Sequence, residues 1–252
     1  ELFFGLLKVI GIFAFFAAIL GLTALLKKPV FMIAVYVFMY ACIYLLVPVA
    51  VHGSLRYRMS RTTWRGIRFG YDGSLKELFF MFVKALPLFI ITFGIYGSFF
   101  FIKMRRYLLE HITIGSVRFG FKGTGGQYFG LVIGGFFLTV ITAGIYSFWY
   151  MRNLFNYMFG NIAVSQESSK YPVKASMTAG AMFRNILMSI VLTVFTLGIG
   201  LAWVIMRNIK LTFDNLEIPA GIDFDSLTQG EKVSKGALGD ELVEALDIGT
   251  VF

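Results

Sequence analysis

The chain has 252 residues, of which 58% are hydrophobic and only 15% are charged, and its mean hydropathy is +0.76. Soluble domains are about 45–50% apolar and about 25% charged, so this composition excludes an ordinary water-soluble globule and predicts a membrane protein. Residues 1–213 carry 21 Lys and Arg against 5 Asp and Glu (+16), whereas residues 214–252 carry 2 against 9 (−7). We therefore expect a basic membrane domain, 1–213, followed by an acidic cytoplasmic tail, 214–252.

The first two apolar stretches, residues 2–26 and 30–51, are long enough to cross a bilayer, which takes about 20 residues. The first is too long for the core of a signal peptide, so we expect a mature transmembrane helix. Glu1-Leu2-Phe3-Phe4, followed by Lys8, matches Glu77-Leu78-Phe79-Phe80, followed by Lys84. The sequence therefore begins inside a repeat, and we expect the native protein to have residues upstream of Glu1.

The rest of the chain is built from repeats. Gly66-Ile67-Arg68-Phe69-Gly70 recurs fifty residues later as Ser116-Val117-Arg118-Phe119-Gly120. A turn motif recurs fifty residues apart as Thr92-Phe93-Gly94-Ile95-Tyr96 and Thr142-Ala143-Gly144-Ile145-Tyr146, and a third, weaker copy follows as Thr196-Leu197-Gly198-Ile199-Gly200. The glycine of this motif can adopt positive φ and end a helix. We place the repeats at 1–55, 56–111, 112–160 and 161–213, and the missing Tyr in the third turn leaves its equivalence open.

Each repeat predicts strands and then a pair of helices. Residues 112–121 alternate with period two around a glycine, which predicts a short β-hairpin. The apolar runs 78–92, 128–142 and 181–196 predict helices that lead into the turn and a second helix. The expected fold class is an all-α polytopic membrane protein of about eight helices in four hairpins, with short β-hairpin elements at the cytoplasmic face. Runs this short either span with the help of snorkelling basic residues or enter the bilayer only partway.

The charges predict the orientation. If every apolar pair is a helical hairpin, both termini and the β segments share one side with 21 of the 23 Lys and Arg, and only Lys27 and Lys28 lie opposite. The positive-inside rule places the richer side in the cytoplasm. Open strand edges also require water, which agrees with this side. Trp64, Trp149 and Trp203 are expected to be interfacial anchors.

The hairpin pattern, the T-x-G-I-Y turn and Thr63-Trp64-Arg65-Gly66-Ile67-Arg68-Phe69 together resemble the YjgN family. This is a group of bacterial inner-membrane proteins with a domain of unknown function, of the DUF898 type. The resemblance covers roughly residues 1–220, and the acidic C-terminal stretch is also similar to the family's tail. It implies a multi-pass location in the bacterial inner membrane, and it implies no activity. A zinc metallopeptidase is implied as a candidate partner, because relatives are often encoded beside one.

The sequence contains no pattern that predicts catalysis. His52 and His111 are its only histidines and Cys42 its only cysteine, too few for a disulfide framework or a His- and Cys-based metal centre. Zinc-peptidase, phosphate-loop and nucleophile-elbow motifs are missing. Gly123-Thr124-Gly125-Gly126 lacks the Lys-Ser/Thr of a nucleotide loop and predicts a turn. We therefore expect a non-enzymatic protein without cofactor or metal, and no nucleic-acid partner.

Basic residues are the candidate contacts for anionic lipid or substrate. Lys8, Lys84 and Arg184 lie within or beside apolar runs. They either snorkel to phospholipid phosphates or line a cationic cavity that binds an anionic headgroup or substrate. A basic patch is expected at the cytoplasmic surface, where it would attract anionic lipid. Its members are Arg56, Arg58, Arg61, Arg65, Arg68, Arg105 and Arg106.

Two further segments suggest contacts. Gly126, Gly130 and Gly134 have G-x-x-x-G spacing, which permits close helix packing within the monomer or in a homo-oligomer. Residues 239–247 predict a short acidic amphipathic helix that pairs with the basic face or with a partner. The function we favour is a membrane scaffold or accessory subunit that interacts with lipid. The alternative is a transporter or lipid-handling protein with a cationic intramembrane cavity.

Overall fold

The computed structural model describes residues 19, 21, 29–166 and 169–218. The predicted helix 2–26, Lys8 and the acidic tail beyond residue 218 lie outside the described residues. The described helices are α2 (Pro29–Arg61), α3 (Leu75–Ile91), α4 (Tyr96–Glu110), α5 (Gly125–Ile141), α6 (Ser147–Gly160), α7 (Ala179–Phe195) and α8 (Leu201–Asp214). The strands are β1 (Thr63–Trp64), β2 (Ile67–Tyr71), β3 (Ile112–Ile114), β4 (Val117–Phe121), β5 (Ile162–Gln166), β6 (Ser169–Pro172), β7 (Lys174–Ala175) and β8 (Leu216–Glu217).

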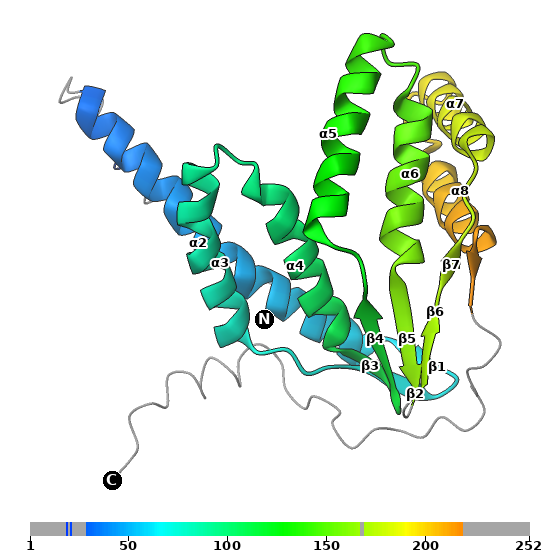
Figure 1. Cartoon of the computed structure of the whole chain (residues 1–252), viewed down its shortest axis with the longest axis horizontal. Helices are drawn as coiled ribbons and strands as arrows, with labels where there is room; N and C mark the ends of the chain where they lie inside the picture. Colours follow the sequence, from blue (N-terminus) through cyan, green and yellow to red (C-terminus); the bar gives the residue numbers. More distant parts are fainter. Residues whose placement is uncertain (1–18, 20, 22–28, 167–168, 219–252) are drawn as a thin grey trace.

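A β-sheet organises the molecule. Strands β1 to β6 form one antiparallel sheet whose spatial order is the order of the chain, and β7 pairs with β8. Each helical hairpin is inserted between two paired strands: α3–α4 connects β2 to β3, α5–α6 connects β4 to β5, and α7–α8 connects β7 to β8. The hairpins extend from the sheet toward the top of Figure 1, and α2 packs beside the first of them.

The three hairpins join their strands in the same way. The N–H after the incoming strand donates to the carbonyl just before the outgoing strand. These bonds run from Asp72 to His111 (3.1 Å), from Lys122 to Asn161 (2.9 Å) and from Ser176 to Asn215 (3.0 Å). The short pair β7–β8 is therefore the third copy of the junctions at β2–β3 and β4–β5.

The expected all-α polytopic fold is wrong, because the short strands join into a six-stranded antiparallel sheet and the fold is α/β. The sequence predicts isolated β-hairpins, whereas their strands also pair with the neighbouring repeat. Phe69 lies opposite Ile114, and Phe121 lies opposite Ile162. A strand with a neighbour on both sides satisfies both of its rows of backbone N–H and C=O groups, which an isolated hairpin leaves half unpaired.

The expectation of about eight spanning helices also needs correction. Among the described helices, α2 alone is long and apolar enough to cross a membrane, over Val30–Arg61. Helices α3, α5 and α7 have 17 residues each. That length corresponds to about 26 Å, which is short of a hydrocarbon core of about 30 Å.

The base of each hairpin is fixed beside the sheet. Ser74, Thr124 and Thr178 cap α3, α5 and α7 by accepting a hydrogen bond from the N–H three residues later. Tyr107 donates from its hydroxyl to Ser74 O (2.9 Å), and Tyr157 donates to Thr124 O (2.6 Å). Burial raises the pKa of both tyrosine hydroxyls, so both keep the proton that they donate.

Two apolar cores lie apart from each other. Within the first hairpin, Leu78, Phe82, Ala85 and Phe100 are buried together, and the rings of Phe82 and Phe100 meet edge to face with centroids 4.9 Å apart. The second core lies at the sheet and contains Ile114, Val117 and Val164. The sheet therefore has a packed core of its own.

Candidate functional site

Three equivalent turns close the hairpins at the ends remote from the sheet. Thr92 Oγ1 donates to Leu88 O (2.6 Å) and accepts from the N–H of Tyr96 (3.0 Å), so one hydroxyl ends α3 and begins α4. The same two bonds join Thr142 to Leu138 and Tyr146, and Thr196 to Leu192 and Gly200. The third turn therefore keeps this threonine bridge although Gly200 stands where the other copies have tyrosine.

Each turn contains two consecutive residues with positive φ. Gly94, Gly144 and Gly198 have φ of +86°, +92° and +90°, a conformation that glycine adopts without steric cost. The residues before them are Phe93, Ala143 and Leu197, with φ of 48°, 49° and 51°. Such values are uncommon for residues with a Cβ, so the turn geometry is imposed by the bonds around it.

Replacing Thr142 by valine removes both bonds of the second turn. Because valine has the same shape but no hydroxyl, the Tyr146 N–H loses its acceptor, and we expect the variant to lose about 1 kcal/mol of stability. Thr142→Ser keeps the hydroxyl, so its free energy of unfolding should differ from that of wild type by only about a few tenths of a kcal/mol. Thermal unfolding in detergent, compared for the three proteins, measures the difference; equal midpoints for valine and serine would contradict it.

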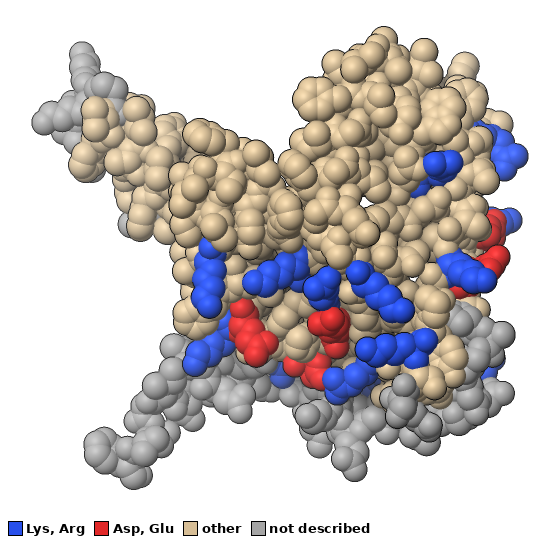
Figure 2. All heavy atoms as spheres, in the orientation of Figure 1, with Lys and Arg blue, Asp and Glu red and all other residues tan. Residues whose placement is uncertain are grey.

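The hairpins are free of charge over most of their length. Residues 85–102, 123–151 and 185–206 contain no Asp, Glu, Lys or Arg. Cations bracket each run, namely Lys84 and Lys103, Lys122 and Arg152, and Arg184 and Arg207. In Figure 2 the charged atoms gather in a band toward the sheet, whereas the hairpins above it present almost only uncharged atoms.

Large apolar side chains cover the charge-free part. Phe93 and Leu197, at the tips of two hairpins, are 96% and 93% exposed. Further along the helices, Ile141, Phe195 and Trp203 are also largely exposed. Exposed apolar surface of this extent is typical of a face that meets a membrane or another protein.

Two arginines of the expected basic patch hold the structure together. Arg106 donates from Nε to Phe121 O (3.2 Å) and from Nη2 to Gly123 O (2.7 Å), and so ties α4 to the end of β4. Arg105 Nη2 donates to Met158 O on α6 (3.1 Å), and its guanidinium lies over the Phe121 ring. Both side chains are half-buried, so they are not a free cationic surface.

The other expected members lie at the end of α2 and in the β1–β2 hairpin. Arg58, Arg61, Arg65 and Arg68 are exposed, whereas Arg56 is half-buried. The Arg65 guanidinium stacks over the Trp64 ring, 4.8 Å from its centroid. These four exposed arginines, with the exposed Lys76, Lys103 and Lys122, form what we call the basic belt.

The candidate anion contacts do not form a shared cavity in the described residues. Lys84 lies on α3 and Arg184 on α7, and both side chains are exposed. Neither lines the cavity described below. Lys8 lies outside the described residues.

The glycine row of α5 faces open space. A Cβ added at Gly126, Gly130 or Gly134 would meet no described atom within 4 Å. Gly135, one position later, is different, because a Cβ there would overlap the Tyr150 ring of α6. Close packing of α5 on α6 therefore depends on Gly135, which the G-x-x-x-G spacing does not include.

The two histidines occupy different places: His52 lies inside α2, and His111 is the C-cap of α4. His52 is 1% exposed, and its ring lies 5.3 Å from that of Tyr71. His111 Nδ1 lies 2.7 Å from Tyr107 O. Within the described ranges, no three His, Cys, Asp or Glu side chains are grouped so that they could hold a metal ion.

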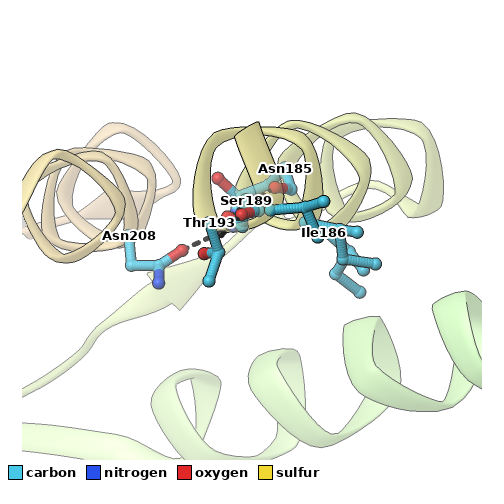
Figure 3. A pocket seen from close by; sticks show the side chains of 7 residues that line it. Asn185, Ile186, Ser189, Thr193 and Asn208 are labelled. Carbon is cyan, nitrogen blue, oxygen red and sulfur yellow. Dashed lines mark hydrogen bonds between the residues drawn. The ribbon is translucent and has the colours of Figure 1, made fainter. Parts of the chain in front are cut away.

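The third hairpin carries an apolar groove with a polar stripe, which the apolar pattern of the sequence does not predict. It has a volume of about 400 Å³ and runs along α7 opposite α8. Asn185, Ser189 and Thr193 follow one another along α7, and Asn208 faces them from α8 (Figure 3). Asn185 Nδ2 donates to Asn208 Oδ1 (2.6 Å). Ile186, Ile190 and Val194 complete the lining, so the groove is an apolar channel with a polar stripe.

The sequence profile of one family, described as "bacterial protein of unknown function (DUF898)", matches residues 1–122, 116–174 and 168–245. The chain belongs to this family. The match confirms the resemblance that the hairpin and turn motifs of this DUF898 protein indicate. No curated protein and no solved structure matches the chain.

Proposed function

We propose that this DUF898 protein is a non-enzymatic scaffold of the bacterial inner membrane. Helix α2 and the three hairpins are embedded in the bilayer, and the sheet lies at the cytoplasmic face. One observation carries the proposal: the charge-free runs of the hairpins, each bracketed by cations, expose their large apolar side chains. In water this surface would be unfavourable, whereas in lipid it is solvated.

Backbone hydrogen bonding determines the side from which the hairpins enter the bilayer. The open edges of a sheet cannot lie in hydrocarbon, because their N–H and C=O groups would be unpaired. The sheet therefore stays in the aqueous interface and the hairpins enter the membrane from its side. The basic belt then lies at the level of the phosphates, where each cation adds about 1 kcal/mol of attraction to an anionic surface.

A scaffold role suits the surface that remains in water. This surface consists of the sheet and the basic belt, and it is available to a protein partner. A zinc metallopeptidase, the partner class implied by the family resemblance, stays a prediction. A carrier with a cationic cavity is less well supported, since Lys84 and Arg184 are exposed on different helices.

Cysteine labelling tests the orientation. In a Cys42→Ser background, Lys170→Cys reports the sheet, and Phe93→Cys and Leu197→Cys report two hairpin tips. We expect a membrane-impermeant maleimide to label the sheet cysteine in inside-out vesicles only, and the tip cysteines not to react from that side. Reaction of the tips from the periplasmic side means that the hairpins cross the bilayer, and protection from both sides means that they end within it. Reaction of a tip in inside-out vesicles would contradict the proposal.

A further inference from the structure

The three hairpins can be compared residue by residue. Their helix caps are Ser74, Thr124 and Thr178, their turn threonines are Thr92, Thr142 and Thr196, and their final caps are His111, Asn161 and Asn215. The spacing between these landmarks is the same in all three copies. Every position in one hairpin therefore has a counterpart in the others, at offsets of 50 and then 54 residues.

The third hairpin lacks the ring that fills the other two. Phe100 is buried in the core of the first hairpin, and Tyr150 occupies the space above Gly135 in the second. Their counterpart in the third is Val204, and the counterpart of Gly135 is Ser189. Valine is much smaller than an aromatic ring and lies one helical turn before Asn208, which lines the groove of about 400 Å³ together with Ser189.

The same comparison shows that the asparagines replace apolar pairs. Asn185 and Asn208 correspond to Met81 and Met104 in the first hairpin and to Leu131 and Leu154 in the second. Asn185 is 93% buried, given its exposure of 7%, and its Oδ1 has no hydrogen-bond partner among the described residues. A buried acceptor without a donor costs about 1–3 kcal/mol. A ligand that brings a donor would remove this cost.

The asparagines lie at one end of the groove, and the hydroxyls further along it, Ser189 and Thr193, already donate to backbone carbonyls of α7. Asn185 lies seven residues after the cap Thr178, or about 10 Å from the sheet end of the helix. From there the apolar lining, Ile186, Ile190 and Val194, continues toward the turn. Beside the asparagines, Arg207 Nη2 donates to the backbone carbonyl of Arg184 (3.4 Å), which places the Arg207 guanidinium there, and the exposed Arg184 precedes Asn185 on α7. This order of cation, amide and apolar wall matches a lipid that stands in the cytoplasmic leaflet.

We propose that this groove binds an anionic phospholipid with a hydroxylated headgroup. A headgroup hydroxyl donates to Asn185 Oδ1, the phosphate faces Arg184 and Arg207, and an acyl chain lies along Ile186, Ile190 and Val194. The inference rests on the proposed function, because it requires the third hairpin to be embedded in the bilayer. It adds a specific lipid site to a general affinity for the membrane.

The second hairpin supplies the variants for a test. The pair Asn185→Leu and Asn208→Leu installs the leucines of that hairpin and removes the acceptor. The pair Ser189→Gly and Val204→Tyr installs its glycine and ring and fills the groove. Arg184→Gln removes a flanking cation, and Lys84→Gln is its charge-matched control on α3. All are to be reconstituted in vesicles of equal parts phosphatidylglycerol and phosphatidylcholine and then extracted in mild detergent for native mass spectrometry.

We expect wild type and Lys84→Gln to retain phosphatidylglycerol. The leucine pair should retain about tenfold less, which is the effect of one lost hydrogen bond of about 1.4 kcal/mol. The groove-filling pair should also retain about tenfold less, because its tyrosine ring takes the place of the lipid. Arg184→Gln should fall between wild type and these pairs. The inference would be overturned if the groove-filling variant retained as much phosphatidylglycerol as wild type. It would also be overturned if the variants retained the same amount of lipid but lost an oligomer that wild type forms, because the groove would then bind a second copy of the chain. Flotation with the vesicles separates the two proposals: variants that float but do not differ overturn the lipid site alone, whereas a wild type that does not float overturns the proposed function as well.

Discussion

Aspartate in place of Phe93, Ala143 and Leu197 should lower the stability of the protein in lipid vesicles. These residues lie at the exposed hairpin tips with φ near +50°, a conformation that aspartate tolerates better than the native residues do. The turns themselves should therefore be kept. A carboxylate deep in hydrocarbon costs about 3 kcal/mol, so the triple variant should unfold at a lower temperature than wild type in lipid vesicles, although α2 still holds it in the membrane.

Asparagine at the same three positions is the matched control. It shares the backbone preference of aspartate and has no charge, so the triple asparagine variant should be much more stable in vesicles than the triple aspartate variant. A triple aspartate variant that is as stable in vesicles as wild type would contradict the embedding of the tips. In that case the same change should raise the thermal midpoint in water, because the strain at three turns is relieved.

Gly135→Ala should destabilise the second hairpin by about 1–3 kcal/mol, because the new methyl group overlaps the Tyr150 ring. The intrinsic helix preference for alanine opposes this by up to about 1 kcal/mol. Gly134→Ala, one residue away, meets no atom within 4 Å and should be neutral or slightly stabilising. Chemical or thermal unfolding in detergent, monitored by circular dichroism, measures both.

A second substitution makes the cause specific. Tyr150→Val installs the residue of the third hairpin and removes the ring, so it should recover most of the stability lost in Gly135→Ala. A double variant as unstable as the sum of the two single variants would show that the methyl group acts elsewhere. Recovery would show that the glycine is needed for the ring and not for the helix backbone.

Repetition makes the hairpins predictable from the sequence. The recurrence of threonine and glycine at Thr92, Gly94, Thr142 and Gly144 marks two turns directly, because a short segment determines its own hydrogen bonds. The third turn is harder, since Gly200 breaks the motif. Its bridge from Thr196 is nevertheless the same, because the bond uses the backbone N–H, which every residue except proline has.

The sheet is not predictable in the same way. The segment that contains Val117–Phe121 alternates as a strand should, yet nothing in it indicates that Ile162–Gln166 pairs along one edge and Ile112–Ile114 along the other. Pairing is a relation between distant segments, and short strands of mixed polarity specify their register weakly. The high proportion of apolar residues in the chain predicts membrane helices, and the short strands between them add too little to the composition to indicate a sheet.

The average composition of the third hairpin does not predict the groove either. Asn185 lies in a run that is apolar on average, and one asparagine changes that average little. The signal is comparative, since the same position holds Met81 and Leu131 in the other hairpins. An alignment of the three hairpins with one another identifies Asn185 as unusual. The structure then shows that its partner is Asn208.

The agreement of strand order with chain order has a consequence for synthesis on the ribosome. Each new strand of the main sheet finds its neighbour already made, so no edge waits for a segment that has yet to be translated. The helical pair between two strands can be delivered to its final place before the next pair leaves the ribosome. Because a unit contacts chiefly the units before and after it, a gene could gain or lose one hairpin without redesign of the others.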